Sequence, residues 1–245
     1  DITTQPMEVG PTAHYVMGGV KVDPLTQETT VQCLYAAGEA ATGLHGANRL
    51  GGNSLSDLIT FGKRSGEFSA KAAAEMDGWE EIPQSEIDEI VAETLAPFSR
   101  KGGENPATVV NDLRKMMQEK VGIIRTKDLL IEALDDLNDF AARGKTTSPG
   151  GSRIYNPGWH QALEIDAMVD ISRMCTIAAL AREESRGGHT REDFPIPDHS
   201  HWGKINSVIM LGEKNEMILE HRTYPPMRDD LKDLLDASDL HEEEE

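Results

Sequence analysis

The chain has 245 residues, with 43 acidic and 24 basic side chains and a formal net charge of -19. This excess of negative charge disfavours nucleic acid and anionic lipid surfaces as partners, because both are polyanions. Hydrophobic residues make up 38% of the sequence, enough to fill the core of one large or two ordinary domains. The acidic runs 229–239 and 242–245 are interpreted as a solvated tail.

The first part of the chain predicts strands, a glycine-rich loop and a helix, in that order. Residues 7–40 alternate short β-branched stretches with Gly and Pro turn signals. Leu34–Ala37 is expected to be a buried strand that stops at Gly38. A helical pattern then runs from Ser54 to about Met76, and Ser54-Leu-Ser-Asp57 has the form of a capping box.

The middle of the chain predicts an antiparallel helix bundle. Apolar residues recur there at spacings of three and four positions, as expected of amphipathic helices. The four stretches are marked by Ile87, Ile90, Val91 and Leu95; by Val110, Leu113, Met117 and Val121; by Leu130, Leu134, Leu137 and Ala141; and by the segment from about Pro157 to Glu184. Beyond them, residues 207–211 and 217–221 predict a hairpin joined by Gly212–Asn215.

Cysteine, histidine and hydropathy patterns restrict the possible classes. Cys33 and Cys175 lie in apolar sequence contexts without Cys-x-x-Cys spacing, so we expect neither a zinc site nor a disulfide, as in a reducing compartment. His199, His201 and His221 lack the spacing of a metal site, and no metal is assigned. No apolar run approaches the roughly 18 residues that span a bilayer, and no signal peptide is present, so a soluble chain is expected.

The densest chemical signal is the loop Gly43–Gly52, which precedes the first predicted helix. Its glycines allow close approach of a ligand, and the helix start directs unpaired N–H groups and partial positive charge toward it. Arg49 adds a planar fork suited to a carboxylate. Glu39, expected just after a strand, is placed to accept hydrogen bonds from a ribose. By composition alone, such a loop is as often structural as functional.

Four segments together carry a family resemblance. They are Ala13–Gly19, the turn Gly38-Glu39, His45–Asp57, and Glu184–Asp193. In this order they resemble successive signatures of the succinate dehydrogenase and fumarate reductase flavoproteins. The related L-aspartate oxidases share the first segments but typically differ at Gly51-Gly52 and Ser56-Asp57, which favours the dehydrogenase branch.

The resemblance implies a cofactor, a substrate class and site residues. His14 and Arg49 match residues that bind the two carboxylates of succinate or fumarate. Glu39 matches the residue that holds the FAD ribose, and Asn53, Ser54 and Leu55 match cofactor-binding residues at the start of the helix near the flavin. The implied reaction is hydride transfer between FAD and a C4 dicarboxylate. His45 either orients Arg49 or fills the loop.

Other parts of the family pattern are missing from these 245 residues. There is no G-x-G-x-x-G segment, no flavin-linking His near one and no capping-domain Arg that shuttles the proton, so no catalytic residue is assigned. Because Asp1 opens without Met on an extended segment, we expect a C-terminal fragment that is inactive alone. The expected domains are the end of an FAD and dicarboxylate domain (1–80), a helix bundle (81–186) and an extended region with the acidic tail (187–245).

The resemblance also implies partners. An iron–sulfur subunit would receive the electrons, and partner subunits would provide contact with the inner face of the cytoplasmic membrane. The alternatives are a helical docking module for an electron-transfer partner, formed by residues 85–185, or an L-aspartate oxidase-like fragment. For Arg186, His189 and Arg191, a basic patch for an acidic ligand and an internal ion-pair network remain equally open.

Overall fold

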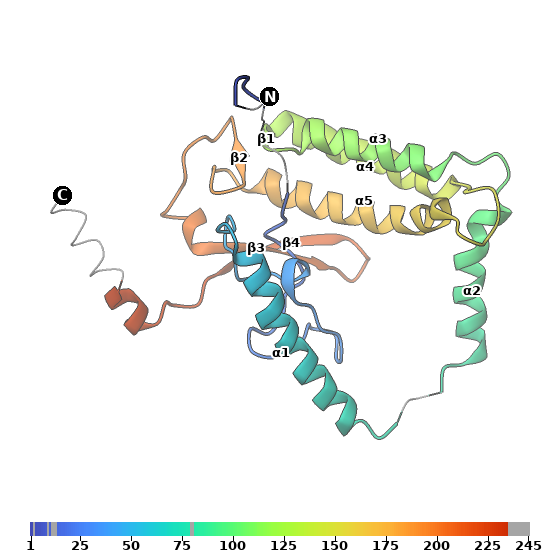
Figure 1. The fold of residues 1–245 in the computed structure, drawn as a ribbon, viewed down its shortest axis with the longest axis horizontal. Helices are drawn as coiled ribbons and strands as arrows, with labels where there is room; N and C mark the ends of the chain where they lie inside the picture. The colour runs from blue at the N-terminus through green and yellow to red at the C-terminus, as the bar shows by residue number, and fades with distance from the viewer. Residues whose placement is uncertain (2, 9, 11–13, 79–80, 235–245) are drawn as a thin grey trace. The chain divides into compact units, whose positions relative to one another are not determined.

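A computed structural model describes residues 1, 3–8, 10, 14–78 and 81–234 (Figure 1). The fold is mainly helical with small sheets, as predicted. Two compact units are distinguished, residues 1–196 and residues 197–245. The predicted domain boundaries after residues 80 and 186 stay predictions. Residues 229–234 are helical and exposed, whereas the rest of the acidic tail lies outside the described residues.

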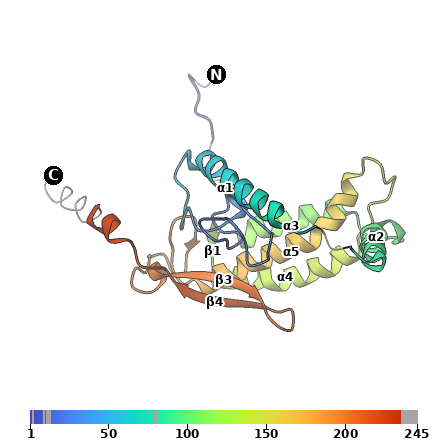
Figure 2. The same ribbon diagram turned by 90° about the horizontal axis from the view of Figure 1, so that it is seen from below.

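Three helices form the core of the first unit: α3 (Pro106–Lys120), α4 (Lys127–Thr146) and α5 (Pro157–Ala181). They lie side by side in both views (Figures 1 and 2). Each begins with a polar side chain that accepts a backbone N–H of the first turn, which satisfies one otherwise unpaired donor. The buried core consists mainly of Val109, Val110, Leu113, Leu130, Ala133, Leu137, Ile165 and Val169. The bundle prediction is therefore confirmed for these three helices.

Helix α2 (Gln84–Ser99) differs from the prediction. It packs against the start of α5, where Trp159 Nε1 donates to Thr94 O at 2.7 Å, and Arg153 in the preceding loop lies over the ring of Phe98, with Cζ 5.8 Å from the ring centroid. Of the four apolar residues that predicted a core-facing stripe, three remain exposed, Ile87 by 40%, Ile90 by 60% and Val91 by 50%, whereas Leu95 is half-buried. Helical periodicity indicates that an apolar face exists, but it does not identify what covers that face.

The region before the bundle contains fewer strands than predicted. Residues 14–52 contain the short 3₁₀ turn η1 (Gly38–Ala40) and isolated bridges that pair Val20 with Ala41 and Glu28 with Tyr35, but no longer strand. The expected buried strand Leu34–Ala37 is wrong, because this segment forms only the isolated bridge at Tyr35 and the Leu34 side chain is 52% exposed. Helix α1 (Asn53–Glu75) follows and packs chiefly against η1.

Two small sheets complete the fold. Strand β1 (Ile124–Arg125) pairs in parallel with β2 (Thr190–Arg191) and ties the C-terminal signature to the start of α4. In the second unit, the short turn η2 (Trp202–Lys204) precedes β3 (Ile205–Leu211), which pairs antiparallel with β4 (Met217–Thr223). The predicted hairpin is therefore confirmed. Among the described helices, none combines the length and apolar character required to cross a membrane.

Candidate functional site

A buried polar network lies beneath the glycine-rich loop. Tyr15, His45 and Asp57 meet there: the Tyr15 hydroxyl donates to Asp57 Oδ2 at 3.2 Å, and His45 Nε2 lies 3.2 Å from the same oxygen. The side chains of His45 and Asp57 are only 8% and 5% exposed. Burial, reinforced by the hydrogen bond to Asp57, raises the pKa of Tyr15, so the hydroxyl stays protonated and remains a donor.

Arg49 lies directly on this network. Its Cζ is 4.8 Å from the centroid of the Tyr15 ring, a cation–π contact, and Nη1 donates to Leu50 O at 3.2 Å. Its Nε is buried and has no hydrogen-bond acceptor among the described residues. A buried N–H without an acceptor costs about 1–3 kcal/mol. A carboxylate bound to the guanidinium would supply the missing acceptor.

The two histidines considered in the sequence are placed differently. His45 contacts Tyr15, whose hydroxyl lies 3.3 Å from its Nε2 and whose ring lies against the Arg49 guanidinium. His14 is exposed and immediately precedes Tyr15. Because Tyr15 contacts Arg49, the segment that contains His14 lies near the Arg49 loop. The assignment of His14 and Arg49 to the binding of a dicarboxylate stays a prediction.

Glu39 and the start of α1 border the same loop. Glu39 lies in η1 rather than after a strand, and its Oε1 accepts the Val16 N–H at 2.9 Å. Helix α1 begins at Asn53 behind Gly52 in the left-handed conformation (φ 83°), so the predicted capping box is wrong: Asp57 bonds Tyr15 instead of capping the helix. The Asn53 N–H donates to Leu50 O at 3.2 Å, and no side chain caps the N-terminus of the helix, whose partial positive charge faces the preceding loop.

The loop is open enough to receive a flat cofactor. At Gly43, Gly46 and Gly52, φ is 113°, 55° and 83°, and a Cβ would meet no atom within 4 Å apart from chain neighbours. Asn53 and Leu55 are exposed and Ser54 is half-buried at the edge of this open space. Donor-rich backbone, open glycines and an acidic side chain at Glu39 suit a dinucleotide.

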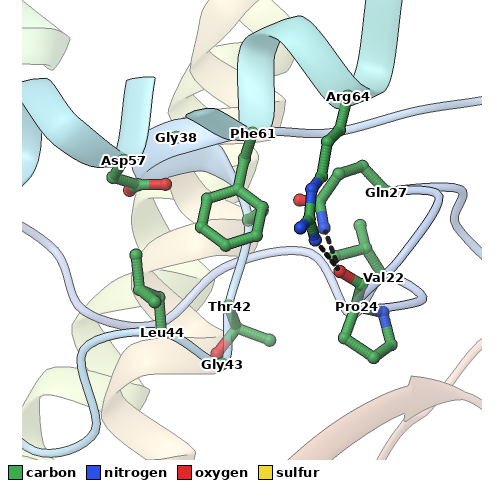
Figure 3. Close-up of a pocket in the computed structure, with 11 residues that line it drawn as sticks. Val22, Pro24, Gln27, Gly38, Thr42, Gly43, Leu44, Asp57, Phe61 and Arg64 are labelled. Carbon is green, nitrogen blue, oxygen red and sulfur yellow. Dashed lines mark hydrogen bonds between the residues drawn. The ribbon is translucent and has the colours of Figure 1, made fainter. Parts of the chain in front are cut away.

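A cavity of about 280 Å³ adjoins the network between α1 and residues 22–44 (Figure 3). Asp57 and Phe61 line it from the helix, and Leu44 lines it from the loop. At the other end, Arg64 Nη1 and Gln27 Nε2 both donate to Pro24 O, at 3.3 and 3.2 Å. No pattern in the sequence predicted this cavity, because its lining comes from three separate segments.

The C-terminal signature forms an internal ion-pair network rather than an exposed basic patch. Glu184 is fully buried and accepts hydrogen bonds from Arg182 Nη1 at 2.6 Å and from Arg186 Nε and Nη2 at 3.0 Å each. Arg191, also fully buried, makes a bidentate pair with Asp193 at 2.8 and 2.7 Å. Its Nη1 donates to the carbonyl of Ala179 at the end of α5, where a cation is favourable.

His189 in this network is held neutral. Arg125 Nη1 lies 2.8 Å from Nδ1, and because a guanidinium can only donate, Nδ1 carries the lone pair. Nε2 lies 3.1 Å from Arg182 O and therefore carries the proton. Burial and the surrounding arginines lower the pKa of His189 to about 4.

This depressed pKa predicts a pH-dependent stability. Between about pH 6.5 and pH 4 the unfolded chain binds a proton at His189 that the folded chain does not, so stability falls as pH decreases, by up to about 1.4 kcal/mol per pH unit. In urea unfolding at pH 7 and pH 5, we expect His189→Gln to lose less stability than the unmodified chain. His160→Gln, at an exposed position, is the control. Equal pH dependence in all three proteins would contradict the assignment.

Metal and cysteine chemistry add nothing to this site. Within residues 14–78 and 81–234, no group of three or more His, Cys, Asp or Glu side chains is arranged to hold a metal ion. Cys33 and Cys175 are both exposed free thiols.

Comparison with known proteins gives consistent matches. The family model described as fumarate reductase flavoprotein C-term matches residues 110–231, and that of an FAD binding domain matches residues 1–55. One subunit of the fumarate reductase (CoM/CoB) of Methanothermobacter marburgensis is 40% identical over 80% of this chain and 35% of its own length. The succinate dehydrogenase flavoprotein subunit of Coxiella burnetii is 36% identical over 83% of this chain and 37% of its own length.

The structure is also similar to solved structures. It superposes on a chain of Mycobacterium smegmatis Sdh1 in complex with UQ1 with a TM-score of 0.87 and 41% identity, covering 98% of this chain and 41% of that one. The chain thus spans 35% and 37% of the length of the two curated relatives above.

Proposed function

The chain belongs to the succinate dehydrogenase and fumarate reductase flavoprotein family, and on this premise we propose that it forms part of a flavoenzyme site that interconverts succinate and fumarate. The observation that carries the proposal is Arg49: its guanidinium is fixed on Tyr15 beside an open glycine loop, with a buried N–H that lacks an acceptor. The remainder of the site is proposed to come from the part of the family's length that this chain does not span.

Arg49 and His14 bind the two substrate carboxylates in this proposal. Arg49 offers a rigid fork that a carboxylate accepts in one orientation, and His14 approaches from the segment that the Tyr15 network anchors. Holding both ends fixes the central carbons, and the positive charge at Arg49 polarises fumarate when it is reduced. No residue of this chain is assigned the proton transfer.

FAD, when bound, supplies the hydride chemistry. Glu39 would accept hydrogen bonds from its ribose, and Asn53, Ser54 and Leu55 would face the flavin from the start of α1. The uncapped helix N-terminus stabilises negative charge that develops nearby. Residues 1–245 by themselves are expected to give no turnover, since no pyrophosphate-binding G-x-G-x-x-G segment lies among them.

Electrons are proposed to pass to an iron–sulfur subunit, with membrane contact at the cytoplasmic face through partner subunits. One observation favours docking as a second function: the exposed apolar side chains of Ile87, Ile90 and Val91 on α2. Such a face on a helix is suited to a protein partner.

Ligand titration of the holoenzyme that contains this chain tests the proposal. Fumarate and malonate are expected to perturb the flavin absorbance saturably, whereas butyrate, with a single carboxylate, is expected to bind at least about tenfold more weakly because one carboxylate partner is lost. If dicarboxylates and butyrate behave alike, the proposed site is wrong. If none perturbs the flavin while an iron–sulfur protein still co-purifies, the docking function is favoured instead.

A further inference from the structure

The turn Arg186–His189 contacts both segments that carry the proposed substrate ligands. Gly188 N–H donates to Ala47 O at 2.9 Å, two residues before Arg49. A Cβ on Gly188 would lie 2.9 Å from Met17 Cε, so the Met17 side chain, three residues after His14, already lies over this glycine. One short turn therefore meets the His14 segment and the Arg49 loop.

The turn itself is rigidly held. Arg186 N donates to His189 O at 2.8 Å and His189 N donates to Arg186 O at 3.0 Å, which closes the two-residue turn. Glu184, fully buried, fixes Arg186 on one side, and His189 bonds Arg125 on the other.

The segment that follows the turn is tied to the bundle. Strand β2 pairs with β1, and Asp193 Oδ2 accepts the Lys127 N–H at the start of α4 at 3.1 Å. The turn is thus attached to the helix bundle on both sides, and we expect its backbone to move less than that of an ordinary surface loop.

Glycine at position 187 is required by this contact. Its φ is 57°, and a Cβ would overlap the Ala47 carbonyl, lying 2.6 Å from its carbon and closer to its oxygen. Backbone atoms cannot move aside as a flexible side chain can, so any side chain at 187 displaces the Arg49 loop. At Gly188 the obstructing atom is the end of the Met17 side chain, which can rotate away.

We propose that Gly187 and Gly188 are positioning residues for substrate, because their turn sets the separation of the His14 and Arg49 segments by holding Met17 and Ala47 against the helix bundle. The inference rests on the proposed function of His14 and Arg49. In this proposal, the buried ion pairs of Glu184 and Arg191 hold the turn in place and so support the substrate site, although these two residues do not contact the substrate.

The test compares Gly187→Ala with Gly150→Ala in the holoenzyme. Gly150 has a matching φ of 59°, but a Cβ there would meet no atom within 4 Å, so it controls for backbone strain alone. We expect Gly187→Ala to raise the malonate Kd about tenfold to a hundredfold, as a shift of about 1 Å in a binding group does. Amide exchange in residues 43–52 should accelerate. Gly188→Ala should give the same changes, smaller in size.

Each outcome decides between the claims. If Arg49→Ala leaves the malonate Kd unchanged, the proposed function fails and the positioning role fails with it. If Arg49→Ala weakens malonate binding while Gly187→Ala behaves as Gly150→Ala does, only the positioning role is overturned. Should Gly187→Ala not accumulate as folded protein, Gly188→Ala becomes decisive, and a Kd and amide protection equal to those of Gly150→Ala would overturn the inference.

Discussion

Replacing Arg49 with alanine is expected to lower kcat/KM for fumarate or succinate by about 10²- to 10³-fold in the holoenzyme. The Arg49 guanidinium is held in place by the Tyr15 ring, while its buried Nε lacks a hydrogen-bond acceptor among the described residues. Alanine removes the carboxylate partner and also the cation on the Tyr15 ring. Both KM and kcat should worsen if Arg49 holds the substrate and polarises it.

Arg49→Lys separates charge from shape. Lysine keeps the positive charge but loses the planar fork and the stacking on Tyr15, so kcat/KM should fall between that of the unmodified enzyme and that of Arg49→Ala. Arg222→Ala in β4, which removes an exposed ion pair with Glu220, is the control and should change kcat/KM little. Steady-state kinetics of the three variants, together with their malonate Kd, test whether Arg49 contributes charge alone or also the shape of its guanidinium. Retention of kcat/KM within about threefold in Arg49→Ala would remove the residue from the site.

Local pattern was sufficient for some elements and not for others. Val110 and Leu113 in α3 and Leu130 and Leu137 in α4 recur at helical spacing and are buried, so these two core helices follow from periodicity. Strand pairing depends on a partner distant in sequence, and the residues around Tyr35 find only an isolated bridge, so β-branched composition overpredicted strands.

At the candidate site, the types of residue in the sequence predict where a ligand would bind, but they do not predict which side chains contact one another. The chemistry of Arg49 and of the glycines indicates a ligand-binding loop, but Ser54-Leu-Ser-Asp57 fits the pattern of a capping box, whereas Asp57 bonds Tyr15. Its partner Tyr15 lies 42 residues away, and no spacing rule connects them. The same holds for Gly188 and Ala47: the sequence pattern marks the segment around Gly188, but its contact with Ala47 exists only in the folded chain.

Glu184→Gln is expected to destabilise the first unit by about 3–5 kcal/mol, because it removes a fully buried negative charge that faces two guanidinium groups. Glutamine keeps the shape of the side chain, so the loss reports charge rather than volume. Glu119→Gln is the matched control within the same unit, since its carboxylate pairs with Lys115 at 3.9 Å on α3, where the two side chains are 60% and 75% exposed. That exposed pair should contribute at most about 1 kcal/mol.

Urea unfolding followed by the helical circular dichroism signal gives both values. Because Glu184 fixes Arg186 at one end of the turn that holds Ala47, partial loosening should also weaken malonate binding below the unfolding transition. Equal destabilisation by Glu184→Gln and Glu119→Gln would mean that the buried network contributes no more than a surface ion pair. The turn would then need another source of rigidity, and the helix bundle would lose its part in setting the position of Arg49.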